Sequence, residues 1–312
     1  MEKVICGVDV SSTWLDARLG LGSVHKRFQL TSCGIEALAS YCRDHSVDLV
    51  VMEATGGYEK QAHKGLHEAG LGVAIANARS VRRFAEGLGF LEKTDKIDAG
   101  IIAEYARVKR LSPQAPASPE QEELTALVTQ LRQLIDARTA LKNQMRLIES
   151  EAVQQSQGRL LDAFNREIKQ IDVLVQAHMK QQTLWIRLVE GLGAIAGVAE
   201  RTMAYLLAYL PELGTLNAKA IAKLVGLAPI AKDSGKSQGR RMVRGGRVQI
   251  RSILVFITSV VARYEPKFRE FRQKLLDAGK PKMVVRTAVA RKLLVIMNAK
   301  ARDIIAELNL AA

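Results

Sequence analysis

The sequence predicts an α/β domain built on a mixed sheet, followed by a largely helical chain that ends in a basic domain. Three observations lead to this prediction. Short strand-like apolar runs crowd residues 1–110, leucines at helical spacing follow residue 121, and the excess positive charge is confined to residues 191–312. We therefore expect three segments, 1–110, 111–190 and 191–312.

The first segment alternates short strand and helix patterns. Three strands separated by few residues predict an antiparallel meander, and strand–helix alternation then adds further strands to form a mixed sheet with helices on its faces. The expected strands are 4–10, 15–21, 24–30, 48–54 and 71–76, and the expected helices are 34–45, 58–69, 78–87 and 95–108.

The second segment opens with a linker and continues as two long helices. Residues 111–121 hold three of the seven prolines, which interrupt the helical pattern. Apolar residues then recur at three- and four-residue spacing on both sides of a polar break at Gln157-Gly158. This pattern predicts an antiparallel coiled-coil hairpin, either within one chain or as a dimer contact.

Charge and composition restrict the class of protein. The net charges of the three segments are +1, −1 and +14, so the whole excess of +14 lies in residues 191–312. Such localised charge favours a polyanionic partner. No long uncharged apolar run or signal peptide is present, and three cysteines are too few for a disulfide framework. We expect a cytoplasmic protein with no membrane partner.

Four acidic residues occupy unusual positions in the predicted elements. Asp9 and Glu53 close buried strands, and Asp95 and Asp98 share one face at the start of a helix. A carboxylate beside a buried strand is costly unless it is compensated, and a pair of Mg²⁺ ions would compensate all four. The alternative is that each acid caps a turn or a helix. His63 and His67 lack a third ligand, so we do not expect a metal there.

Residues 232–251 form a cationic, glycine-rich segment ahead of an apolar helix at 252–263. The segment contains seven basic residues and one acid, and its composition argues against a hydrophobic strand. We expect it to contact the DNA backbone, although a solvated charged loop has the same composition. The candidate contacts are Lys232, Lys236, Arg240, Arg241, Arg244, Arg247 and Arg251.

Several motifs resemble those of one family. The segments GVDVSS (7–12), MEATGGYE (52–59) and KTDKIDA (93–99) resemble the three blocks of the DEDD transposases of insertion-sequence family 110, relatives of the Piv-type DNA invertases. GLAP (226–229), DSG (233–235) and GGRVQIR (245–251) resemble that family's second domain. One departure is that Ser11-Ser12 stand where the first block often has a lysine, which removes a phosphate contact but no metal ligand.

The resemblance implies a fold and a set of roles. The first segment would have a RuvC-like, RNase H fold, with Asp9, Glu53, Asp95 and Asp98 as catalytic ligands of two Mg²⁺ ions, for which Mn²⁺ could substitute. Ser234 would be the catalytic nucleophile that attacks a phosphodiester.

The resemblance also implies partners and a place. The partners would be double-stranded DNA at the element ends and target, a guide (bridge) RNA, and further copies of the chain in a dimer or tetramer, in the cytoplasm of a prokaryote. Two other functions fit the residues. One is a RuvC-like nuclease or junction resolvase that uses water, and the other is a non-enzymatic architectural DNA-binding protein.

Overall fold

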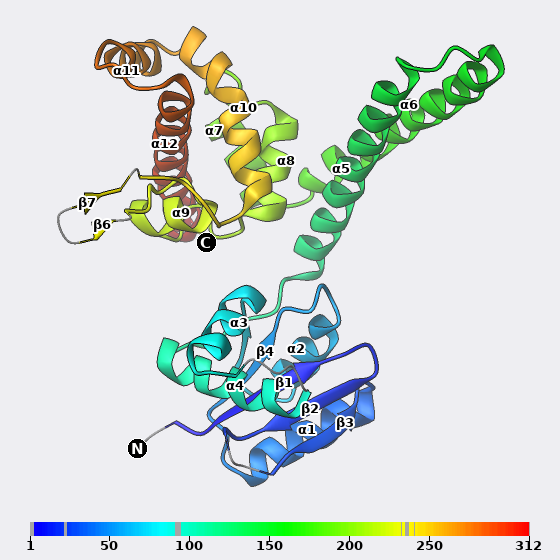
Figure 1. The fold of residues 1–312 in the computed structure, drawn as a ribbon, viewed down its shortest axis with the longest axis vertical. Coiled ribbons are helices and arrows are strands. Elements are labelled where there is room, and N and C mark those ends of the chain that lie inside the picture. The colour runs from blue at the N-terminus through cyan, green and yellow to red at the C-terminus, as the bar shows by residue number, and fades with distance from the viewer. Residues whose placement is uncertain are drawn as a thin grey trace. The chain divides into compact units, whose positions relative to one another are not determined.

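The protein divides into two compact units, Met1–Ala117 and Ser118–Ala312, which are described separately. The computed structural model, drawn in Figure 1, describes residues 3–21, 24–90, 95–231, 233–234, 237–239 and 241–311. At residues 95–97, 237, 238 and 311 it describes the backbone alone.

The first unit is built on a mixed five-stranded sheet. Its strands are β1 (Ile5–Val10), β2 (Trp14–Arg18), β3 (Lys26–Gln29), β4 (Leu49–Glu53) and β5 (Val73–Ala76), and their order across the sheet is β3-β2-β1-β4-β5. The meander β1–β2–β3 is antiparallel, as its short connections require. Parallel pairing joins β1 to β4 and β4 to β5, and helices supply the crossovers.

Helices cover both faces of this sheet because successive strand residues point to opposite sides. The helices are α1 (Ser32–Asp44), α2 (Glu59–Glu68), α3 (Ala78–Gly87) and α4 (Asp95–Lys109). Cys6 and Val8 of β1 share a core with α1 and α2, whereas Val51 of β4 shares one with α3 and α4. This architecture confirms the predicted mixed sheet with helices on its faces, and it is consistent with the RNase H-like fold that the resemblance implies.

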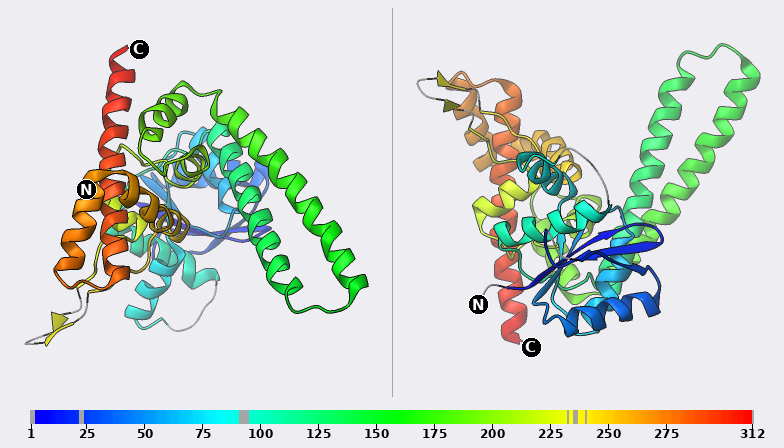
Figure 2. Two further views of the ribbon diagram at one scale, coloured as in Figure 1. Left: turned by 90° about the horizontal axis from the view of Figure 1, so that it is seen from above. Right: turned by 60° about the horizontal axis from the view of Figure 1, so that its bottom comes forward.

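The second unit begins with a helical hairpin of α5 (Pro119–Met145) and α6 (Glu151–Met179), and Figure 2 shows these long helices side by side in both views. Ser118 caps α5, accepting a hydrogen bond from the Gln121 N–H. The predicted break at Gln157-Gly158 is wrong. Nothing lies within 4 Å of the position that a Gly158 side chain would occupy, so this glycine costs α6 only about 1 kcal/mol of helix propensity.

The rest of the second unit is a helical body. Its elements are α7 (Thr183–Gly193), α8 (Glu200–Tyr209), α9 (Ala218–Val225), the short strands β6 (Asp233–Ser234) and β7 (Ser237–Gln238), α10 (Val248–Tyr264), α11 (Pro266–Asp277) and α12 (Lys282–Ala311). Leu124 and Val128 of α5 and Val175 of α6 belong to the same core as Leu206 of α8 and Leu293 of α12. The base of the hairpin and the body therefore share one interior.

The structure confirms a largely helical second half, whereas the three-part division at 110 and 190 stays a prediction. In the described part of the chain, no helix is both long enough and apolar enough to cross a membrane. Helix α10 begins four residues before the predicted 252, because Val248 and Ile250 extend its apolar face.

Candidate active site

Two of the predicted metal ligands lie level at one edge of the sheet. The parallel register pairs Gly7 with Val51 and Val8 with Met52, so Asp9 and Glu53 come next on neighbouring strands. Residues at matching positions of parallel strands point to the same face. Asp9 and Glu53 are therefore directed to the face that α3 and α4 cover, and both are half-buried.

A third carboxylate, which the sequence analysis missed, stands beside Asp9. Asp16 of β2 is the antiparallel partner of Asp9, and its residue is 2% exposed. Arg27 donates to both oxygens of Asp16 at 2.9 and 3.1 Å, and the His25 Nε2 lies 2.5 Å from Oδ1. Directly opposed like charges destabilise a sheet, and Arg27 offsets that effect here. The sequence signal was an acid inside the predicted strand 15–21, at the centre of the meander.

Helix α4 approaches the sheet closely at Gly7. A β-carbon at Gly7 would stand 2.0 Å from the Ala99 carbonyl oxygen and 2.6 Å from the Ala103 nitrogen, so only glycine allows this contact. Because Asp98 immediately precedes Ala99, this contact fixes the segment of α4 that bears Asp98 against β1. Asp95 begins α4, and its side chain lies outside the described ones.

The loop after Glu53 is organised by a further carboxylate. Glu59 accepts hydrogen bonds from the Thr55 backbone N–H, the Thr55 hydroxyl and the Gly57 N–H at 3.2, 2.9 and 2.8 Å. Partial burial raises the pKa of Glu59, but these hydrogen bonds outweigh it and leave the pKa below its ordinary value. The charged form of Glu59 therefore holds the turn that follows Glu53.

The arrangement suits a divalent cation by its chemistry. Hard carboxylate oxygens on adjacent strands and on α4 are the ligands that Mg²⁺ prefers. Among the side chains that the structure describes, no three His, Cys, Asp or Glu side chains form a metal-binding group, and Asp95 is not among them. His63 is buried, and its Nε2 lies 2.8 Å from the Gln114 carbonyl oxygen, as expected of a structural histidine.

The predicted basic segment forms a short hairpin in the second unit. Asp233 pairs with Gln238 and Ser234 with Ser237, and Ile230 pairs with Met242 near the base. Ser234 is exposed. The Arg241 guanidinium lies 3.8 Å from the Asp233 carboxylate. Three of the candidate DNA contacts, Lys232, Lys236 and Arg240, lie outside the described residues.

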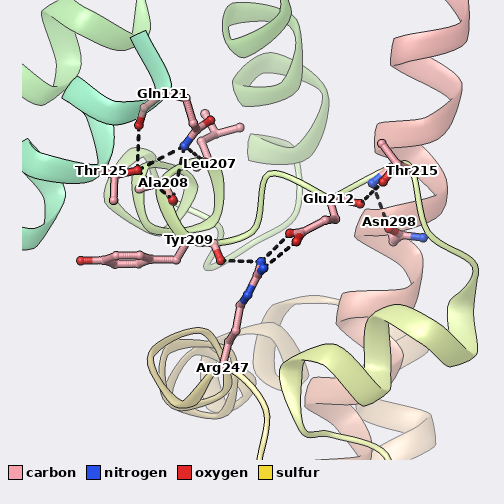
Figure 3. Close-up of polar contacts among 10 residues, drawn as sticks. Gln121, Thr125, Leu207, Ala208, Tyr209, Glu212, Thr215, Arg247 and Asn298 are labelled. Atoms are coloured by element: carbon pink, nitrogen blue, oxygen red, sulfur yellow. Dashed lines mark hydrogen bonds and ion pairs between the residues drawn. The ribbon is translucent and has the colours of Figure 1, made fainter. Parts of the chain in front are cut away.

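The C-terminal end of this segment is anchored to the helical body. Arg247 forms an ion pair with Glu212 and donates to the Tyr209 carbonyl at 2.9 Å, as Figure 3 shows. Arg251 donates to the Gly245 carbonyl. A β-carbon at Gly246 would stand 2.4 Å from the Gly226 nitrogen, so these two glycines let the segment lie on the end of α9. Both arginines thus have structural partners, whereas Arg244 is exposed.

Comparisons with known proteins match both halves of the chain. A transposase family model, that of the DEDD transposases of the IS110 type, matches residues 6–148, and a model described as the transposase IS116/IS110/IS902 family matches residues 190–273. The chain belongs to the IS110 family of DEDD transposases. It is therefore a DNA recombination enzyme that carries out phosphoryl transfer, and the family implies a divalent metal ion.

Two curated relatives of this transposase extend the likeness over nearly the whole chain. The pilin gene-inverting proteins of Moraxella lacunata and Moraxella bovis are 27% and 28% identical to it over 322 residues, which cover 97% of this chain and 97% of each relative. The transposase is thus similar in length and sequence to proteins named for inverting a gene.

Proposed function

We propose that the protein is a site-specific recombinase of an insertion sequence that cleaves and exchanges DNA strands with a serine nucleophile and bound Mg²⁺. The observation that carries the proposal is the level placement of Asp9 and Glu53 on adjacent strands, beside the glycine contact that fixes the Asp98 segment. The likeness to the pilin gene-inverting proteins supports a reaction that rejoins the strands it cuts.

In this proposal residues 1–110 form a RuvC-like catalytic domain, 111–190 a linker and coiled-coil hairpin, and 191–312 the DNA-handling domain. Asp9, Glu53, Asp95 and Asp98 hold two Mg²⁺ ions, or Mn²⁺ in their place. When bound, such ions polarise the scissile phosphate and stabilise the charge on the leaving oxygen. Asp16, with its own arginine, stays outside the ligand set and keeps the neighbouring strand in register with Asp9.

Ser234 is the proposed nucleophile. Its hydroxyl oxygen attacks the phosphorus, the bond from phosphorus to the sugar oxygen breaks, and the serine proton ends on the released sugar hydroxyl. The cut strand is then a phosphoserine ester, which keeps the bond energy available for rejoining. Exposure of Ser234 on a short hairpin allows a DNA backbone to reach it.

The basic segment is the proposed contact with double-stranded DNA. Lys232, Lys236, Arg240, Arg241 and Arg244 contact phosphates, and binding weakens steeply with salt as counterions are released. Arg247 and Arg251 hold the end of the segment in place and reach DNA only with the N–H groups that remain.

The proposal includes a guide RNA and a homo-oligomer, both on the strength of the family resemblance. A mixing experiment tests the oligomer directly. Asp9→Asn and Ser234→Ala proteins are each expected to be inactive, and their mixture should regain activity if one protomer's serine works with another's carboxylates. Active mixtures of two dead proteins cannot arise from independent monomers.

The decisive test is covalent capture of DNA. The purified protein is incubated with labelled element-end DNA, the RNA transcribed from the element end and Mg²⁺, and protein–DNA adducts are separated on a denaturing gel. Ser234→Ala should form no adduct, whereas Ser237→Ala, its register partner in the hairpin, should form the parent's amount. Glu36→Gln, an exposed acid on α1, is the control for Asp9→Asn and Glu53→Gln.

The outcomes also separate the alternative enzyme. A RuvC-like nuclease that uses water would cut DNA without an adduct and would keep cutting in the Ser234→Ala protein. Adduct formation that survives Ser234→Ala would refute the serine, and strand exchange that survives Asp9→Asn would refute the carboxylate site.

A further inference from the structure

A hollow of about 830 Å³ lies between α10, α11 and α12, away from the basic segment. Its lining residues are Thr258, Ser259, Ala262, Arg263, Tyr264, Arg269, Arg272, Leu276, Lys282, Val285, Arg286 and Val289. Residues three, four and seven apart on each helix line it, so each helix contributes one face. The hollow is thus a feature of the rigid body.

The hollow is cationic. Five of its lining residues are basic, all five are exposed, and none of the twelve is acidic. Within the described part of the chain, none of these five cations forms an ion pair with a carboxylate. Arg269 and Arg286 each donate one N–H to a backbone carbonyl, of Arg263 and Val255. The nearby Glu265 accepts from the Ala196 N–H. The remaining guanidinium N–H groups can therefore bind phosphates.

An exposed aromatic ring stands at the edge of the hollow. Tyr264 is 60% exposed, and the Arg263 guanidinium carbon lies 5.5 Å from its ring centroid. Phe256 is 73% exposed and lies two turns earlier on the same face of α10, with Val260 between them. Large exposed rings beside cations are the feature on which unpaired bases stack, whereas bases within a duplex leave no face free.

We propose that this hollow, the α10–α12 groove, binds single-stranded nucleic acid. Arg269, Arg272 and Arg286 contact successive phosphates, and a base stacks on Tyr264. The inference deepens the proposed function, because strand exchange and a guide RNA both present unpaired strands. It does not depend on Ser234 or on the carboxylates, since binding needs no cleavage.

The test is fluorescence anisotropy with the full-length chain and three labelled probes of equal length: oligo-dT, oligo-U and a mixed-sequence duplex. The Arg269→Ala/Arg272→Ala protein should bind the single strands about tenfold more weakly or worse. Its matched control is Lys274→Ala/Lys280→Ala, which removes the same charge from exposed residues outside the groove lining. The arginine pair should also flatten the dependence of log Kd on log salt by about 0.7 per lost contact.

Tyr264 supplies an independent readout, because an exposed ring can be removed without disturbing the core. Tyr264→Ala should weaken binding of the single strands about tenfold, and Tyr264→Phe should bind like the parent. Comparison of oligo-dT with oligo-U shows whether DNA or RNA is preferred. Equal losses in both charge pairs, equal losses on the duplex, or an unchanged Tyr264→Ala protein would overturn the proposal. If Ser234→Ala abolishes adducts while these losses are absent, only the groove is refuted.

Discussion

Replacing Gly7 with alanine should separate α4 from the sheet and disable the enzyme. The new β-carbon would stand 2.0 Å from the Ala99 oxygen, and ordinary contact begins at 3.4 Å, so α4 must retreat by about 1.4 Å. Overpacking costs about 1–3 kcal/mol. We expect about 3 kcal/mol, since the two nearest atoms are backbone and cannot rotate away. For a unit of this size that lowers Tm by roughly 10–20 °C.

Two other glycines of the same unit provide controls. At Gly65 an added β-carbon would meet the Ile35 Cγ2 atom at 2.8 Å, a side chain that can rotate. At Gly87 it would meet nothing within 4 Å. Gly65→Ala should therefore be close to neutral, and Gly87→Ala slightly stabilising, because alanine favours a helix over glycine by about 0.5–1 kcal/mol.

The assay uses the two tryptophans, Trp14 and Trp185, one in each unit. In a Trp185→Phe background, fluorescence during thermal unfolding reports on Trp14 and hence on the first unit. A displacement of this size at the segment that bears Asp98 should also reduce Mg²⁺-dependent cleavage about 100-fold. If Gly7→Ala melts together with Gly87→Ala and cleaves at the parent rate, the close contact of α4 with β1 is not what positions the site.

Three further predictions follow from contacts described above. Arg247→Met should lower the stability of the second unit by about 2 kcal/mol, measured by Trp185 fluorescence in urea, because Glu212 loses its partner in a half-buried site. Glu59→Gln should cost about 1 kcal/mol at neutral pH. Because the folded pKa of Glu59 is depressed, this difference should disappear as pH falls below its ordinary value of 4.5. Gly158→Ala should stabilise α6 by about 1 kcal/mol, seen in the urea midpoint.

Each of these predictions has a result that contradicts it. An Arg247→Met protein as stable as Arg244→Met, an exposed arginine of the same segment, would show that the Glu212 ion pair adds nothing. A Glu59→Gln difference that persists at pH 3 would show that its carboxylate charge is not the cause. A loss of stability in Gly158→Ala would mean that α6 does not run through this residue.

The sequence predicted local structure better than long-range contacts. Ala78–Gly87 was placed correctly because its helical spacing lies between two clear breaks. The predicted break at Gly158 failed because glycine interrupts a helix weakly, whereas the turn before Glu151 ends one fully. In the site, Asp9 and Glu53 were recognisable from strand ends alone.

Long-range pairing explains the rest. Asp16 was missed because its importance depends on Asp9 and Arg27, which stand opposite it only in the folded sheet. Arg247 resembles its neighbours in the basic segment, yet it differs from them by contacting Glu212, 35 positions away. Composition identified the cationic segment but could not show which arginines already have partners.

The shared interior of the hairpin base and the helical body has a practical consequence for protein engineering. A chimera joined at residue 190 would match Leu124 and Val175 of one parent against Leu206 of another, and mismatched cores cost about 1–3 kcal/mol at each poor contact. A junction at the unit boundary after Ala117 divides no core. Targeting specificity should therefore be transplanted between relatives by exchanging residues 118–312 as one block.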